Sequence, residues 1–113
     1  MKVLLDDCVP ERLRSHLPGH EVHSVRFAGF SGRKNGDLLR LAEQAGYDVL
    51  LTVDQGVPYQ QSMSGRTIAV LVLRAPANDI HTLKQMADAA TRSLSSISSG
   101  TITELVFPGT SAK

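Results

Sequence analysis

The chain has 113 residues, a formal net charge of +1 and a single cysteine, Cys8. This length suits one compact domain, and the near-neutral charge excludes a strongly basic nucleic-acid coat. One cysteine allows no intramolecular disulfide, and the sequence contains neither a signal-peptide core nor a run of about 18 apolar residues, so we expect a cytoplasmic protein without a membrane segment.

The N-terminal quarter of the chain predicts a strand, a helix and a second strand. Residues 3–5 form a short continuous apolar run, which is typical of a strand buried on both faces in a parallel sheet. Pro10 suits the first turn of a helix, and residues 11–17 continue the helical pattern until Pro18 and Gly19 end it. The alternating residues 21–25 predict the second strand.

The next segment predicts a helix followed by a third strand. Asn35 is a favourable N-cap, and Asp37 falls in the first helical turn, where a negative charge is favoured. An apolar stripe then continues until Gly46, which ends the helix. Residues 49–53 form a third buried strand, and Asp54 follows at once.

The C-terminal half predicts two more strands around one helix. Residues 67–73 contain the longest β-branched run, which favours a strand. Asn78 or Asp79 caps the helix that follows, and residues 102–107 form the last strand.

Strands therefore alternate with helices along the whole chain. This order predicts an α/β domain with three layers and a mainly parallel central sheet. We expect a single domain over residues 1–107 and a loose C-terminal tail over residues 108–113.

Four aspartates are expected at one edge of this sheet. Asp6 and Asp7 follow the first strand, Asp54 follows the third, and Asp37 begins a helix that is entered from the carboxyl end of a strand. Carboxylates gathered in this way repel one another unless a cation compensates, and Mg²⁺ or Mn²⁺ is the usual cation for oxygen ligands. Such a site suits hydrolysis of a nucleic-acid phosphodiester. The alternative is the ordinary use of Asp in turns and at helix N-termini.

Three stretches of the chain resemble the small PIN-like domain family of the PIN nuclease superfamily: VLLDDCVPERL, GHEVHSV and KNGDLLRLAEQAGYDVLLTVD. The resemblance implies a Rossmann-like α/β/α PIN-like fold and metal-dependent endoribonuclease activity, often as the toxin of a toxin–antitoxin pair. Asp6, Asp37 and Asp54 match the metal-site positions of the family, and Asp7 matches a position that is often acidic or amide. The implied partners are an RNA substrate, an antitoxin protein and a second copy of the chain.

The chain departs from the family at Gly56, where many relatives carry a second aspartate after the third carboxylate. Either Asp7 substitutes for the missing ligand, or the metal keeps an extra water, or the domain binds RNA or a protein partner without cutting. A phosphoacceptor domain of the receiver kind is a further alternative, but the spacing of its acids differs and no matching Thr and Lys follow.

Three further residues are candidates for contact with nucleic acid. Arg33 and Lys34 precede the helix that carries Asp37 and are placed to contact phosphates, unless they are solvated loop charges. Tyr59 follows the third carboxylate and is placed to stack on a base, unless it belongs to a structural turn.

Overall fold

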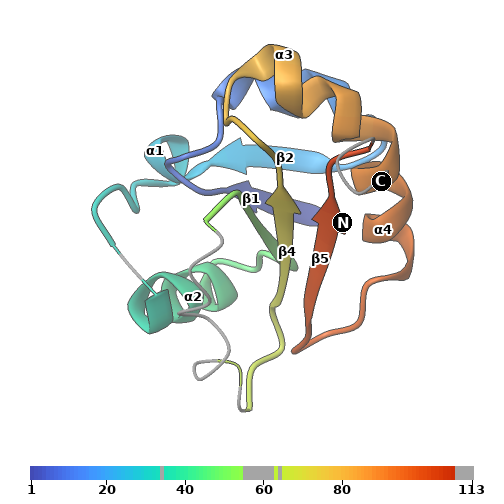
Figure 1. Ribbon diagram of the computed structural model, residues 1–113. Coiled ribbons are helices and arrows are strands. Elements are labelled where there is room, and N and C mark those ends of the chain that lie inside the picture. The colour runs from blue at the N-terminus through green and yellow to red at the C-terminus, as the bar shows by residue number, and fades with distance from the viewer. Residues whose placement is uncertain (34, 55–62, 64, 109–113) are drawn as a thin grey trace.

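The computed structural model describes residues 1–33, 35–54, 63 and 65–108, which contain both strands and helices (Figure 1). The elements are β1 (Lys2–Leu5), η1 (Glu11–His16), β2 (Glu21–Ser24), α1 (Val25–Ala28), α2 (Asn35–Gln44), β3 (Val49–Thr52), β4 (Ala69–Arg74), α3 (Ile80–Leu83), η3 (Lys84–Met86), α4 (Ala87–Ser96) and β5 (Ile102–Val106). No helix among these residues has the length and apolar character needed to cross a bilayer. The predicted tail lies outside them from residue 109 onward.

The strands form one five-stranded sheet in the order β2-β1-β3-β4-β5, and every neighbouring pair is parallel. The prediction of an α/β protein with a parallel central sheet is confirmed. The chain moves from β1 outward to β2 and then returns past β1 to form β3, so the strand order reverses between β1 and β3. A reversal of this kind leaves a crevice at the carboxyl ends of the two strands, where ligands bind in open α/β sheets.

The buried side chains form two hydrophobic clusters, and alternate residues of each central strand belong to different clusters. In β3, Val49 and Leu51 lie in the first cluster and Leu50 lies in the second. The first cluster also contains residues of η1, α3 and α4, and the second contains residues of α1 and α2. The strands are therefore apolar on both faces, which explains why their sequences run as continuous apolar stretches rather than alternating ones.

Two predicted elements near the N-terminus differ from the structure. The segment after Pro10 is a 3₁₀ helix, in which the N–H of Leu13 donates to the Pro10 carbonyl three residues back. The second strand ends at Ser24 rather than at residue 25, because the Ser24 hydroxyl accepts a hydrogen bond from the Phe27 N–H and so caps α1. This one-turn helix ends at Gly29, whose φ of 84° is left-handed. The pattern of residues 21–25 predicted a strand, and α1 was not predicted.

The predicted strand at residues 67–73 is displaced toward the C-terminus and runs from Ala69 to Arg74. The backbone N–H groups of Thr67 and Ile68 donate to the carboxylate of Glu43 and do not join the sheet. Of the two caps predicted for the following helix, Asp79 is the one found, since its carboxylate accepts from the Thr82 N–H at 2.7 Å.

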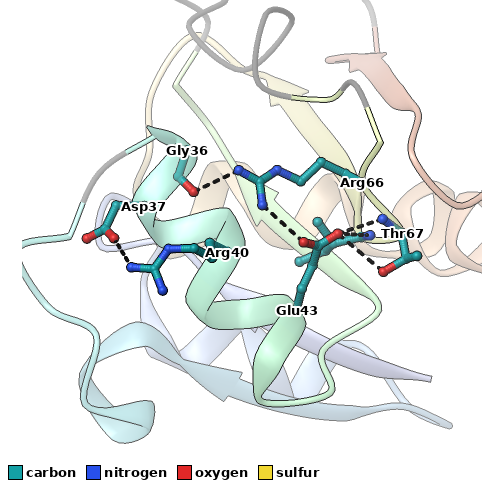
Figure 2. A network of polar contacts seen from close by, with 7 residues as sticks. Gly36, Asp37, Arg40, Glu43, Arg66 and Thr67 are labelled. Carbon is teal, nitrogen blue, oxygen red and sulfur yellow. Dashed lines mark hydrogen bonds and ion pairs between the residues drawn. The ribbon is translucent and has the colours of Figure 1, made fainter.

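Glu43 is the centre of a polar network that fixes α2 to the start of β4 (Figure 2). Its carboxylate accepts hydrogen bonds from the Arg66 guanidinium at 3.0 Å, from the Ile68 N–H at 3.1 Å and from both the N–H and the hydroxyl of Thr67. Arg66 also donates to the Gly36 carbonyl at 3.1 Å. Because Gly36 lies in the first turn of α2 and Glu43 in its last, this network holds both ends of the helix that carries Asp37.

Burial would raise the pKa of Glu43, but the hydrogen bonds from Ile68, Thr67 and Arg66 outweigh it and hold the pKa below the ordinary value. A carboxyl whose pKa is lower in the folded state stabilises the fold above its unfolded pKa. That contribution is lost as the pH falls through the folded pKa.

We predict that Glu43→Gln lowers the free energy of unfolding by about 1.5–3 kcal/mol at pH 7, because the amide loses hydrogen bonds to a charged acceptor. Glu104→Gln is the matched control, since Glu104 pairs with Arg74 on the exposed surface, and it should cost about 0–1 kcal/mol. Urea unfolding measures both. The difference between wild type and Glu43→Gln should shrink below about pH 4.5. Equal losses in the two variants would contradict the role of the network.

Candidate functional site

Asp6 lies directly after β1, at the point where the strand order reverses. Its N–H donates to the Leu51 carbonyl of β3 at 2.9 Å, and its own carbonyl accepts from the Val9 N–H at 3.0 Å. The chain therefore turns sharply over residues 6–9 and leaves the sheet. The Asp7 N–H donates to Asp6 Oδ1 at 2.8 Å, which fixes the orientation of the Asp6 carboxylate.

The hydroxyl of Thr52 joins Asp6 to the segment that carries Asp54. Thr52 ends β3 and is fully buried. Its Oγ1 donates to Asp6 Oδ2 at 2.8 Å and accepts from the Asp54 N–H at 3.1 Å. A buried hydroxyl needs such partners, because leaving it unpaired is costly. One threonine thus connects the Asp6 carboxylate with the backbone of Asp54.

Cys8 lies beside this pair of residues. Its sulfur is 3.5 Å from Thr52 Oγ1 and 3.9 Å from Asp6 Oδ2. The carbonyl of Cys8 accepts from the Asn78 side chain at 3.1 Å, so the loop after β4 holds the turn after β1 in place.

The carboxylate of Asp37 is held by two arginines. Arg33 lies 3.3 Å from Asp37 Oδ2, and Arg40, one turn along α2, pairs with Oδ1 (Figure 2). The hydrogen bond from Arg40, with a smaller contribution from Arg33, holds the pKa of Asp37 below its ordinary value. The predicted metal-site residue is therefore ionised and paired with cations of its own chain. Arg33, a candidate for phosphate contact, is engaged in the same ion pair.

Asp6 and Asp54 are two predicted ligands that directly follow or lie next to the ends of the neighbouring strands β1 and β3. No three His, Cys, Asp or Glu side chains are grouped to hold a metal ion within the described ranges. Mg²⁺ in phosphate-processing sites keeps several waters and takes only one or two carboxylates from the protein, with the substrate supplying further oxygens. Asp6 and Asp54 are two aspartates at the strand reversal, and the four predicted aspartates do not form one metal-binding group among the described residues.

Three positions named in the sequence analysis lie outside the described residues, and Asp7 lies inside them. Lys34 and Tyr59, proposed for contact with nucleic acid, and Gly56, where the chain departs from the PIN-like pattern, lie outside the described residues. Asp7 is exposed on the turn after β1.

A cavity of about 270 Å³ opens beside Asp6, between the turn after β1 and the junction of β2 with α1. Its polar lining consists of three carboxylates, one hydroxyl and one guanidinium, and its apolar lining of two valines and a proline: Asp6, Asp7, Glu11, Ser24, Arg26, Val9, Val25 and Pro10. Glu11, Ser24 and Arg26 were not among the site residues predicted from the sequence. Ser24 and Arg26 could have been found from the sequence, because Ser24 is a typical N-cap and Gly29 a typical C-cap. Together these two residues indicate the one-turn helix that carries Arg26.

We predict that Thr52→Val and Asp6→Ala are energetically coupled. Each single change breaks the hydrogen bond between these two side chains, so the double variant should lose less stability than the two single variants together. The coupling in a double-mutant cycle of unfolding free energies should be about 0.5–3 kcal/mol. Strict additivity would mean that the Thr52 hydroxyl does not hold the Asp6 carboxylate.

We also predict that Arg40→Gln raises the pKa of Asp37 toward 3.8, because it removes the hydrogen bond that lowers this pKa most. A carbon-13 NMR titration of the Asp37 carboxyl measures this pKa. Arg92→Gln on α4 is the control and should leave it unchanged. If Asp37 titrates at the same pH with and without Arg40, the ion pair does not persist in solution.

No family model, curated protein or solved structure matches the chain in the comparisons made with each. The resemblance to small PIN-like domains consequently rests on the sequence motifs alone, and the site is interpreted from its own geometry.

Proposed function

We propose that the chain is a metal-dependent endoribonuclease of the small PIN-like kind. The observation that carries the proposal is the Thr52 hydroxyl, which binds the Asp6 carboxylate and the Asp54 N–H where the strand order reverses. Mg²⁺ or Mn²⁺ bound there supplies a water of lowered pKa and stabilises charge on a phosphodiester. The finer fold assignment, a three-layer α/β/α PIN-like arrangement, belongs to the same proposal and is supported by helix residues in both core clusters.

The residues of the chain have separate roles in this proposal. Asp6 and Asp54 are the ligands, and Thr52 is a positioning residue that keeps the Asp6 carboxylate directed along the edge. Asp7 contributes its N–H to Asp6 and an exposed carboxylate that adds negative charge nearby. Asp37 joins the site only if Arg33 and Arg40 leave it, and the phosphates of a bound strand are the groups that compete for those arginines.

An antitoxin protein and a second copy of the chain are the partners that the family resemblance suggests. We carry both forward as part of the proposal. An antitoxin that covers Asp6 would block access to the proposed metal site.

The second candidate function is a module that binds RNA or a protein partner without cleaving it. The pairing of Asp37 with Arg33 and Arg40 favours this alternative, because it removes one carboxylate from the proposed metal site. The two functions differ in whether the carboxyl edge binds a divalent cation.

Metal binding and RNA cleavage test the proposed function together. Saturating Mn²⁺ should raise the unfolding temperature of the wild type, since a ligand at about 100 times its Kd stabilises by about 2.7 kcal/mol. Asp6→Asn should abolish this shift and lower RNA cleavage by about 100-fold or more, because the charge-stabilising ion is lost. Asp88→Asn, an exposed acid in the first turn of α4, is the control and should keep both.

The two functions give different results in this experiment. Cleavage that requires Mn²⁺ or Mg²⁺ and Asp6 supports the nuclease. If neither metal shifts the wild type and RNA is bound intact, the nuclease proposal is wrong and the binding module takes its place.

A further inference from the structure

Arg26 differs from four other arginines of the described chain, each of which forms an ion pair. Four arginines of the described chain pair with carboxylates: Arg33 and Arg40 with Asp37, Arg66 with Glu43, and Arg74 with Glu104. The Arg26 side chain makes no ion pair within the described ranges, although it lines a cavity that also contains three carboxylates. Its charge is therefore available to a ligand without breaking an existing contact.

The local fold explains how Arg26 reaches the cavity. β2 passes into α1 without a loop because Ser24 ends the strand and caps the helix. Arg26 then lies in the single turn of α1, beside the turn that carries Asp6 and Asp7. A chain that continued as a strand through residue 26 would direct alternate side chains to the two faces of the sheet instead.

The lining of the cavity restricts the ligands that it can take. Three carboxylates and one guanidinium give a net negative charge, so a simple anion is repelled unless a cation accompanies it. A phosphate paired with a divalent cation meets both demands, with the cation toward Asp6 and a phosphate oxygen toward Arg26. Of the apolar lining residues, Val9 and Val25 are buried in the core clusters, and the half-buried Pro10 is the one placed to contact a sugar or base. The volume of about 270 Å³ lies just below the usual range for ligand pockets of about 300–1,000 Å³, which suits one nucleotide unit.

We propose that this cavity is a nucleotide subsite next to the carboxyl edge, in which Arg26 binds a phosphate of the RNA strand. The inference rests on the proposed function for the identity of the ligand. It assigns the phosphate contact to Arg26 rather than to Arg33, whose guanidinium already neutralises Asp37. Arg26 is a binding and positioning residue here and takes no part in the chemical step.

Equilibrium binding of RNA tests the subsite separately from catalysis. The probe is a short fluorescein-labelled single-stranded RNA, and fluorescence anisotropy is measured in EDTA and in Ca²⁺ between about 50 and 200 mM salt. Arg26→Gln should lower the affinity in Ca²⁺ by about tenfold. It should also reduce the slope of log K against log salt by about 0.7, the value for one phosphate contact on a single strand.

Two matched variants make the measurement specific. Arg92→Gln removes the same charge from the exposed surface of α4 and should leave the salt slope unchanged. Arg26→Lys keeps the charge and should restore most of the slope while binding less tightly, because lysine cannot form the two-pronged contact of arginine. Unfolding temperatures of all three variants show whether the fold is intact.

The outcomes separate this inference from the proposed function. If Arg26→Gln and Arg92→Gln bind the RNA with equal affinity and slope, or if the wild type binds no RNA, the subsite is overturned. Mn²⁺-dependent cleavage that requires Asp6 but not Arg26 would support the nuclease proposal and contradict the subsite. A salt slope that depends on Arg26, with no metal-induced change in unfolding temperature and no cleavage, would support the subsite and contradict the nuclease proposal.

Discussion

Parallel pairing of β1 with both β2 and β3 is the constraint on which the rest of the structure depends. It makes β1 a central strand buried on both faces, and it directs the carboxyl ends of all three strands to one edge. Every segment that leaves that edge must return along a face of the sheet to start the next strand. The turn after β1, the junction of β2 with α1 and the end of β3 are neighbours for this reason, and the candidate site and its cavity are built from those three segments.

Asp37 and Asp6 differ in whether their partners are near or far along the chain. Asp37 lies four residues after Arg33 and three before Arg40, which are the spacings at which helical neighbours meet, so its partners come from its own stretch of chain. Asp6 instead depends on Thr52, a residue of a different strand. The two aspartates consequently differ in their partners. The Asp37 carboxylate forms ion pairs with two arginines, whereas the Asp6 carboxylate accepts a hydrogen bond from a neutral hydroxyl.

The sequence predicts the strands and the meeting of Asp6 with Asp54 because both follow from patterns that act over a few residues plus the geometry of a parallel sheet. It does not predict the role of Glu43, because its partners Arg66, Thr67 and Ile68 lie more than twenty residues away along the chain. The N–H groups of Thr67 and Ile68 bind the Glu43 carboxylate instead of pairing with a neighbouring strand. Nor does the sequence predict the cavity, since the choice between strand and helix at residue 25 turns on a single capping hydroxyl at Ser24. The ion pairs of Asp37 have helical spacing and can be predicted from the sequence.

The pairing of β1 also determines how late the sheet can form. Val3 must find Val22 on one side and Val49 on the other, so the strand at the very start of the chain stays incomplete until nearly half of the residues are present. The entropy cost of closing loops of that length comes before the strand contacts form, so folding is slower than in helical proteins of similar size. During synthesis, the apolar residues of β1 are exposed for that whole interval, and this strand is where a nascent chain would associate with a chaperone or with another copy of itself.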